Sequence, residues 1–288
     1  MAPKSVLITG CSEGGIGDAL AKEFHRKGLR VFATARNLAK VQHLKNLGLE
    51  ILPLDVVDAD SIAQAVESVR ALTGGTLDIL VNNSGYGYIS PLLDTDISEA
   101  KKLFEVNVFA VIEVTKAFSP LLIASKGTIV NIGSVAGKMP LPWQGYYNAS
   151  KAAIHLLTSQ LRFELSPFDV KAICIVTGVV KTKFFANASS ITLSSTSIYA
   201  PAVEEINIVQ SGEVTGDDGQ SADDYARAVV KNVLKRSPTF IPWVGGSAFL
   251  MWFLDTFLWA TFFVCIGPHL MYLCLVDVGS SGCPSNPV

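Results

Sequence analysis

The end of this chain lacks basic residues. No Lys or Arg follows Arg236, and only two acids, Asp255 and Asp277, lie beyond it. Charged residues make up 17% of the 288 residues and hydrophobic residues 49%, whereas about a quarter of a typical soluble domain is charged. The formal net charge is −2. The chain therefore has no excess of positive charge to attract nucleic acid, and we expect no nucleic-acid partner.

Cysteine and histidine are scarce, and neither is spaced as a set of metal ligands. No cysteine stands in a CxxC pair and each histidine stands alone: Cys11, Cys174, Cys265, Cys274 and Cys283; His25, His43, His155 and His269. We therefore expect reduced thiols in an intracellular compartment and no metal site. An apolar run begins at Ser5, which leaves no room for a secretory signal peptide and also favours an intracellular protein.

What the sequence does contain is a regular alternation of apolar runs and amphipathic stretches. The runs predict six buried strands, at 5–10, 30–36, 50–56, 77–83, 127–134 and 170–178. The amphipathic stretches predict helices at 16–27, 38–46, 60–72, 97–124, 147–165 and 221–236. This order predicts an α/β fold, a three-layer doubly wound parallel sheet of the Rossmann type, over residues 1–238.

The segment TGCSEGGIG (residues 9–17) joins the first predicted strand to the first predicted helix. Glycines allow the backbone to approach a pyrophosphate, and the N-terminus of the following helix offers amide donors and a partial positive charge. A glycine cluster alone is a weak signal, but the strand–turn–helix setting is the one that a dinucleotide requires. We expect the cofactor to contact Gly10, Ser12, Gly15, Ile16 and Gly17.

The second predicted strand ends in Thr34-Ala35-Arg36, without an acid. A carboxylate there would accept hydrogen bonds from the ribose 2′-hydroxyl of NAD(H), while an arginine suits the 2′-phosphate of NADP(H). We therefore expect NADP(H), with Arg36 as the phosphate ligand and Ser12 as a second donor. The alternative is that Arg36 merely ends a surface strand.

Two adjacent tyrosines, Tyr146 and Tyr147, precede Lys151 in YYNASK. On a helix, residues four apart share a face, whereas Tyr146 lies about 140° around the axis from Lys151. Free tyrosine has a pKa near 10, which a neighbouring ammonium would lower. We therefore predict that Tyr147 exchanges protons and that Lys151 lowers its pKa. The YxxxK spacing is common, so a buried tyrosine beside a surface lysine is the alternative.

In combination, the motifs resemble those of the short-chain dehydrogenase/reductase family. They are, in order, TG…GIG, Asp55-Val56, NNSG (82–85), Ser134, Tyr147, Lys151 and Thr182, over residues 5 to about 238. The resemblance implies a catalytic tetrad of Asn107, Ser134, Tyr147 and Lys151. It also implies cofactor contacts from Asp55 and Val56 at the adenine, from Asn82 and Gly85 along the cofactor, and from Val180 and Thr182 near the nicotinamide or phosphates.

The same resemblance implies the chemistry. NADPH would deliver a hydride to a carbonyl carbon while Tyr147 protonates the carbonyl oxygen, which Ser134 would stabilise by a hydrogen bond. Asn107 would hold a water molecule that returns a proton through Lys151.

Two departures from the family pattern bear on the site. The glycine turn is one residue longer than the commonest form, which leaves open whether Gly14 or Gly15 meets the phosphate. Thr177-Gly178 stands where Pro-Gly is usual, which predicts a looser hinge after the sixth strand.

Two regions break the strand–helix rhythm. Residues 183–220 follow the sixth strand, and we expect them to form a lid over the carboxyl ends of the strands. Residues 239–288 form an apolar tail, in which 239–244 predict a seventh strand and 256–276 are long enough to span a bilayer, with a kink at Gly267-Pro268. We expect membrane association through a spanning helix or an interfacial anchor. The alternative is a helix buried over the substrate mouth or against the second subunit of a homodimer.

Within the family, the chain resembles the fungal NADPH-dependent 1-acyldihydroxyacetone phosphate reductases, through LDILVNNSG, VNVFAVIEV, YNASKAAIH and the apolar C-terminal region. This implies a lipid-like ketone or alcohol as the small-molecule substrate, at the cytoplasmic face of the endoplasmic reticulum or of lipid droplets. Lys231, Lys235 and Arg236, just before the tail, favour the same face. Two alternatives remain: a fungal tailoring ketoreductase for a polyketide or terpenoid, and a non-catalytic NADP(H)-sensing scaffold.

Overall fold

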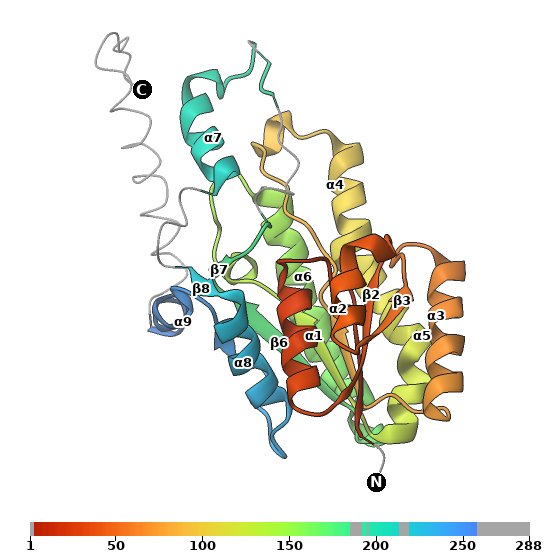
Figure 1. Ribbon diagram of the computed structural model, residues 1–288. Helices are drawn as coiled ribbons and strands as arrows, with labels where there is room; N and C mark the ends of the chain where they lie inside the picture. The colour runs from red at the N-terminus through yellow and green to blue at the C-terminus, as the bar shows by residue number, and fades with distance from the viewer. Residues whose placement is uncertain (1–2, 185–191, 195, 213–218, 258–288) are drawn as a thin grey trace, which may run out of the picture.

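A seven-stranded parallel sheet forms the centre of the computed structural model, which describes residues 3–184, 192–194, 196–212 and 219–257 (Figure 1). Its strands lie in the order β3-β2-β1-β4-β5-β6-β9, and every neighbouring pair is parallel. The bounds are Ser5–Ile8 (β1), Arg30–Ala35 (β2), Glu50–Pro53 (β3), Ile79–Asn82 (β4), Thr128–Ile132 (β5), Lys171–Thr177 (β6) and Trp243–Val244 (β9). The predicted doubly wound parallel sheet is confirmed.

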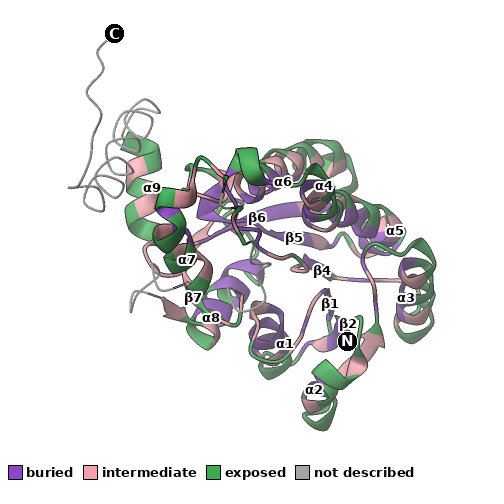
Figure 2. Cartoon of the chain, turned by 90° about the horizontal axis from the view of Figure 1, so that it is seen from above, coloured by how far each residue is buried: buried purple, intermediate pink, exposed green. Residues whose placement is uncertain are grey.

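Helices cover both faces of the sheet (Figure 2). One face carries α1 (Ile16–Arg26), α2 (Gln42–Asn46) and α8 (Ala222–Val233). The other carries α3 (Ala59–Thr73), α5 (Ala110–Ser125) and α6 (Gly145–Leu165), with α4 (Ile97–Phe104) packed on α6. All four residues of β1 are buried, because a strand covered by helices on both faces has no solvent-exposed side.

Two of the predicted helices are interrupted. The stretch 97–124 is α4, then a π-helical turn at Glu105–Phe109, then α5. The Ala110 N–H donates to the Glu105 carbonyl across this turn, which widens the helix at Asn107. The stretch 38–46 begins as the 3-10 turn Leu38–Val41 before α2. The apolar spacing on either side of each turn remains helical, so the sequence pattern did not show the interruption.

Smaller elements lie beyond the carboxyl ends of the strands (Figure 1). They are the pair β7 (Val180–Lys181) and β8 (Gln220–Ser221), and helix α7 (Val203–Ser211) of the predicted lid. The amide of Gln210 on α7 donates to the Ile89 carbonyl at 3.4 Å. The rings of Tyr199 and Trp143 meet edge to face, with centroids 5.6 Å apart. The described part of the lid is therefore attached to the loops that follow β4 and β5.

The predicted tail begins inside the fold. β9 lies beyond the predicted domain end at residue 238 and pairs with β6, as expected for a seventh strand in TFIPWV. It is followed by α9 (Ala248–Phe257). Among the described residues, one helical stretch, Ile97–Ser125, is long and apolar enough to cross a membrane. Its residues Val114 and Phe118 are buried in the core, so it packs as a core helix. The predicted spanning segment 256–276 lies, after Phe257, outside the described residues.

Candidate active site

A cavity of about 870 Å³ lies at the carboxyl ends of the strands. Since these ends meet at one edge of a parallel sheet, residues that follow all seven strands gather around it. The cavity brings together thirteen of the predicted site residues: Gly10, Ser12, Gly15, Ile16, Arg36, Asp55, Val56, Gly85, Ser134, Tyr147, Lys151, Val180 and Thr182. Three other predicted residues, Gly17, Asn82 and Asn107, do not line it.

The glycine turn is shaped as a cradle for a phosphate group. Gly10 has a φ of 71°, a conformation that favours glycine. A Cβ at Gly17 would lie 2.5 Å from the Gly10 carbonyl oxygen, so Gly17 lets α1 approach the end of β1 rather than contacting the cofactor. The Gly14 N–H donates to Asp18 Oδ2 at 3.0 Å, whereas Gly15 precedes α1 and lines the cavity. Of these two glycines, Gly15 is the one that lines the cavity, where a phosphate would lie.

A recess with two cations extends from this turn. Ser12, Arg36 and Lys40 line it, together with Ala35 and Asn37. Within the described chain, no carboxylate forms an ion pair with Arg36 or Lys40. The Glu13 N–H donates to the Lys40 carbonyl at 3.2 Å and ties the glycine turn to this segment. The recess fits an additional phosphate beside the dinucleotide.

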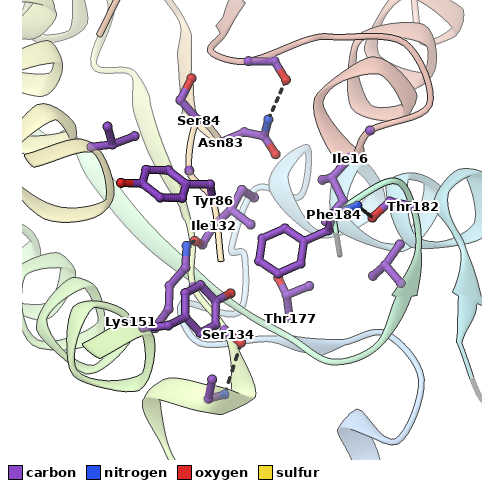
Figure 3. A pocket seen from close by; sticks show the side chains of 18 of the residues that line it. Ile16, Asn83, Ser84, Tyr86, Ile132, Ser134, Lys151, Thr177, Thr182 and Phe184 are labelled. Carbon is purple, nitrogen blue, oxygen red and sulfur yellow. Dashed lines mark hydrogen bonds between the residues drawn. The ribbon is translucent and has the colours of Figure 1, made fainter. Parts of the chain in front are cut away.

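Tyr147, Lys151 and Ser134 all line the cavity, and Figure 3 shows the side chains of Ser134 and Lys151 in it. Tyr147 and Lys151 are both buried, and the Lys151 Nζ lies 5.8 Å from the centre of the Tyr147 ring. The same ammonium donates to the Ile132 carbonyl at 3.0 Å. The Ser134 hydroxyl oxygen accepts from Ala136 N–H at 3.1 Å, so its own proton can be donated to an oxygen in the cavity.

The pKa values of this pair differ from the prediction. Burial raises the pKa of Tyr147 to about 12, and the hydrogen bond with Ser134 acts in the lowering direction. Burial lowers the pKa of Lys151 to about 8. The predicted lowering of the Tyr147 pKa by Lys151 is therefore not seen in this structure, because loss of solvent around the phenolate outweighs the Ser134 hydrogen bond. At neutral pH Tyr147 holds its proton, which is the form that can donate to a carbonyl oxygen.

Asn107 and Asn82 lie behind the cavity wall. Asn107, on the π turn, accepts from Tyr86 N–H at 3.1 Å and donates to the Tyr86 carbonyl at 3.0 Å and to Ser150. Asn82 is buried and donates to Thr115 and Asn131. Both amides therefore position neighbouring segments. The cofactor contact of Asn82 and the water relay at Asn107 stay predictions.

Some lining residues were missed from the sequence. Asn83 Nδ2 donates to the Thr9 carbonyl at 2.8 Å and to the Gly10 carbonyl at 3.0 Å, which ties the turn after β4 to the glycine turn (Figure 3). Phe184, in the predicted lid, packs on the Tyr147 ring with centroids 5.7 Å apart. Lys40 could have been found from the sequence as a second cation four residues after Arg36. No sequence pattern indicated Phe184, because the lid lies far along the chain from α6.

The hinge after β6 is held more firmly than predicted. The Thr177 hydroxyl and the Tyr225 hydroxyl on α8 share a buried 2.7 Å hydrogen bond. The Gly178 N–H donates to the Val244 carbonyl at 2.8 Å. A Cβ at Gly178 would lie 2.3 Å from the Gly246 carbonyl oxygen, so only glycine fits. The side chain of Thr177 and the close approach of β9 thus provide the rigidity that a proline would have supplied.

His155, one turn after Lys151, supports Ser134 from behind. The Ser134 N–H donates to His155 Nε2 at 3.3 Å, which requires a neutral imidazole. Burial lowers the pKa of His155 to about 4, and Lys138 and Lys151 act in the same direction. In the unfolded chain His155 has a pKa near 6.5. Between about pH 6.5 and pH 4 the unfolded state therefore binds a proton at His155 that the folded state does not bind, and the protein loses stability as the pH falls.

We expect His155→Gln to flatten the pH dependence of stability. Glutamine keeps an acceptor for the Ser134 N–H but does not titrate. Between pH 7.5 and 4.5 the wild type should lose about 2 kcal/mol more unfolding free energy than the variant, measured by urea denaturation. His25→Gln, at an exposed histidine on α1, is the control and should leave the pH dependence as in the wild type. Parallel curves for the wild type and His155→Gln would contradict the neutral, buried imidazole.

A phosphate cradle beside a buried tyrosine and serine defines a Rossmann-type oxidoreductase, because this pair can exchange a proton with the oxygen of a carbonyl or an alcohol. The chain belongs to the short-chain dehydrogenase/reductase family, whose sequence model, described as short chain dehydrogenase, matches residues 4–191. It is therefore an oxidoreductase that acts on CH–OH or C=O groups and uses a nicotinamide cofactor.

Curated relatives and solved structures agree with this assignment. The chain is 45% identical to "Short-chain dehydrogenase PC-15" of Penicillium crustosum over 82% of this chain and 86% of that protein. It is 44% identical to the "NADPH-dependent 1-acyldihydroxyacetone phosphate reductase" of Schizosaccharomyces pombe over 69% of each chain. A short-chain dehydrogenase from Streptomyces avermitilis superimposes with a TM-score of 0.78 at 25% identity, over 98% of this chain and 100% of the other.

Proposed function

We propose that this protein is an NADP(H)-dependent oxidoreductase that interconverts a lipid-like ketone and its secondary alcohol at a membrane surface. One observation carries the proposal: the recess with Arg36 and Lys40 opens into the same cavity as Ser134 and Tyr147. A cofactor whose 2′-phosphate is held by Arg36 and Lys40 would extend toward Ser134 and Tyr147. The name of the Schizosaccharomyces pombe relative, which is NADPH-dependent, supports the same cofactor.

The residues of the cavity divide into a binding set and a reacting set. Gly10, Gly15 and the first turn of α1 would hold the pyrophosphate, and Arg36 with Lys40 the 2′-phosphate. The bound nicotinamide supplies the hydride in reduction and accepts it in oxidation.

In reduction, Tyr147 donates its phenolic proton to the substrate oxygen while the Ser134 hydroxyl donates a hydrogen bond to the same oxygen. Lys151, fixed by the Ile132 carbonyl, provides positive charge beside the phenolate that remains.

The substrate end of the cavity supports an apolar substrate. Its walls beyond Tyr147 include Leu141, Pro142, Phe184, Val209 and Met251. None of these five residues is an acid, and a hydrocarbon chain would bury its surface against them. A carbonyl at Ser134 with a long apolar substituent fits this arrangement, and the relative's name, an acyldihydroxyacetone phosphate reductase, describes a compound of that kind.

The membrane part of the proposal rests on the chain's end. Residues 258–276 contain no Lys, Arg, Asp or Glu, and Lys231, Lys235 and Arg236 precede them. This distribution favours a catalytic domain on the cytoplasmic face of an internal membrane, such as the endoplasmic reticulum or a lipid droplet.

The proposal is tested by following NADPH and NADH oxidation with a series of methyl ketones of increasing chain length. We expect activity with NADPH, and a rise in kcat/KM of about fourfold for each added methylene until the apolar walls are covered. A ring-containing polyketide-like ketone is included in the series. If only that compound were reduced, the protein would be a tailoring ketoreductase. If NADPH bound and no ketone or alcohol reacted, the scaffold alternative would replace this proposal.

A further inference from the structure

Helix α9 has two different sides. Met251 on α9 lines the cavity, as does Ser247, which immediately precedes the helix and lies four positions before Met251. On a regular helix Phe249, Phe253 and Phe257 share another face, and Met251 lies about 200° from Phe249. Phe249 is 76% exposed, and Phe253 and Phe257 are also exposed. The helix therefore separates the substrate end of the cavity from an apolar outer surface.

The outer surface of α9, defined as Phe249, Leu250, Phe253 and Phe257, is unusual for a soluble protein. All four side chains are exposed, and the rings of Phe253 and Phe257 pack against each other with centroids 5.0 Å apart. Asp255, the one charged residue of α9, lies on the side of Met251 rather than among these rings, because it follows Met251 by four positions. Figure 2 shows α9 at the edge of the described part of the chain, with much of its ribbon coloured as exposed. A contiguous apolar patch of this kind marks an interaction surface.

The chain that follows indicates what covers this surface. Residues 258–276 carry no charged side chain, and their length is that of a bilayer-spanning segment. A lipid bilayer explains both features, because its interface can cover the apolar face of α9 and its apolar interior can take up the segment that follows. α9 has no Lys or Arg, so its contact would depend on apolar burial rather than on anionic headgroups.

We propose that the outer surface of α9 lies in the interface of a lipid bilayer and that the opposite side of the helix forms the cavity wall next to it, so that an apolar substrate passes from the bilayer into the cavity beside Met251. The passage of substrate rests on the function proposed above, while the contact of α9 with lipid does not. The exposed Ile208, on the lid helix α7, would extend the same apolar surface around the mouth, since the neighbouring Val209 lines the cavity.

The contact is tested by hydrogen–deuterium exchange of the full-length protein with vesicles of neutral phosphatidylcholine. Amides of 248–257 should exchange about tenfold more slowly in vesicle-bound protein, with the same protection at high salt. The double variant Phe249→Gln, Phe253→Gln should lose this protection while the protein stays on the vesicles through its tail. The matched control is Leu156→Gln, Phe163→Gln, which changes two exposed apolar residues of α6 and should keep the protection at α9.

Three outcomes would overturn the contact. Vesicle-bound wild type without protection at 248–257 would show that lipid does not cover α9. Protection without vesicles that grows with protein concentration would assign the surface to a second copy of the chain. Protection without vesicles at every concentration would assign it to the protein's own tail.

The passage of substrate is tested by comparing two ketones with the same reconstituted proteins. For a long-chain ketone dissolved in the vesicles, the α9 variant should lose about tenfold in kcat/KM, while a short water-soluble ketone should react within about twofold of wild type. The α6 control should match wild type with both. Equal losses for both ketones would contradict entry from the bilayer. If neither ketone reacts with any protein but α9 is protected by vesicles, the proposed function fails and the lipid contact stands.

Discussion

Replacement of Tyr147 by phenylalanine is expected to lower kcat for ketone reduction by about 10³-fold, while the dissociation constant of NADPH stays within about twofold. Phenylalanine keeps the ring that packs on Phe184 and the burial of the site, but it removes the phenol that we propose as the proton donor. Ser134 would still stabilise the substrate oxygen without protonating it. Single-turnover reduction followed at 340 nm, with cofactor binding followed by fluorescence, separates the two quantities.

The neighbouring Tyr146→Phe is the matched control. Tyr146 is half-buried on the same helix but does not line the cavity, so its variant should retain wild-type kcat within about twofold. Loss of activity in Tyr146→Phe with full activity in Tyr147→Phe would reverse the assignment. Full activity in both variants would exclude Tyr146 and Tyr147 as the proton donor.

The second large effect is expected at the cationic recess. The double variant Arg36→Ala, Lys40→Ala should weaken NADPH binding by about 10²-fold and leave NADH binding unchanged. Each side chain can form a charge-assisted hydrogen bond with the 2′-phosphate. Both are exposed, so the effect should lie at the lower end of the range for such bonds and should shrink as salt is added. Titration of each cofactor at two ionic strengths measures it.

Lys45→Ala serves as the control for loss of a positive charge. Lys45 is exposed on α2, close in sequence to Lys40, and does not line the recess. Its variant should bind NADPH as the wild type does. An unchanged ratio of NADPH to NADH affinity in the double variant would mean that the recess does not receive the 2′-phosphate. The single variants then show whether Arg36, predicted from sequence, or Lys40, found only in the structure, contributes more.

Much of the site could be predicted because it consists of local patterns attached to strand ends. Gly10, Arg36 and Ser134 each follow a buried strand, and parallel strands bring their carboxyl ends to one edge whatever the loops contain. Tyr147 and Lys151 meet because four residues on a helix bring two side chains to one face. These placements depend on chain geometry alone.

For other residues the sequence did not show the packing contacts, because the direction of a side chain depends on its folded surroundings. Asn82 ends β4 next to Asn83, and only the pairing of β4 with β5 turns Asn82 toward Asn131 and leaves Asn83 at the glycine turn. Gly17 proved to serve helix packing, since its Cβ would meet the Gly10 carbonyl. Neither outcome follows from the residue type or its spacing.

Sequence alone was sufficient to predict the doubly wound sheet, the cofactor turn and the pairing of Tyr147 with Lys151. These features arise from the periodicity of strands (two residues) and helices (3.6 residues), and from the common edge at which parallel strands end. Only the folded protein decided the proton affinity of Tyr147, since the burial that raises its pKa to about 12 is produced by distant segments, among them the lid residue Phe184. The two-sided character of α9 was likewise decided in three dimensions, where β9 joins β6 and brings Met251 to the cavity. Burial and solvent access are properties of the assembled chain, and no short stretch of sequence encodes them.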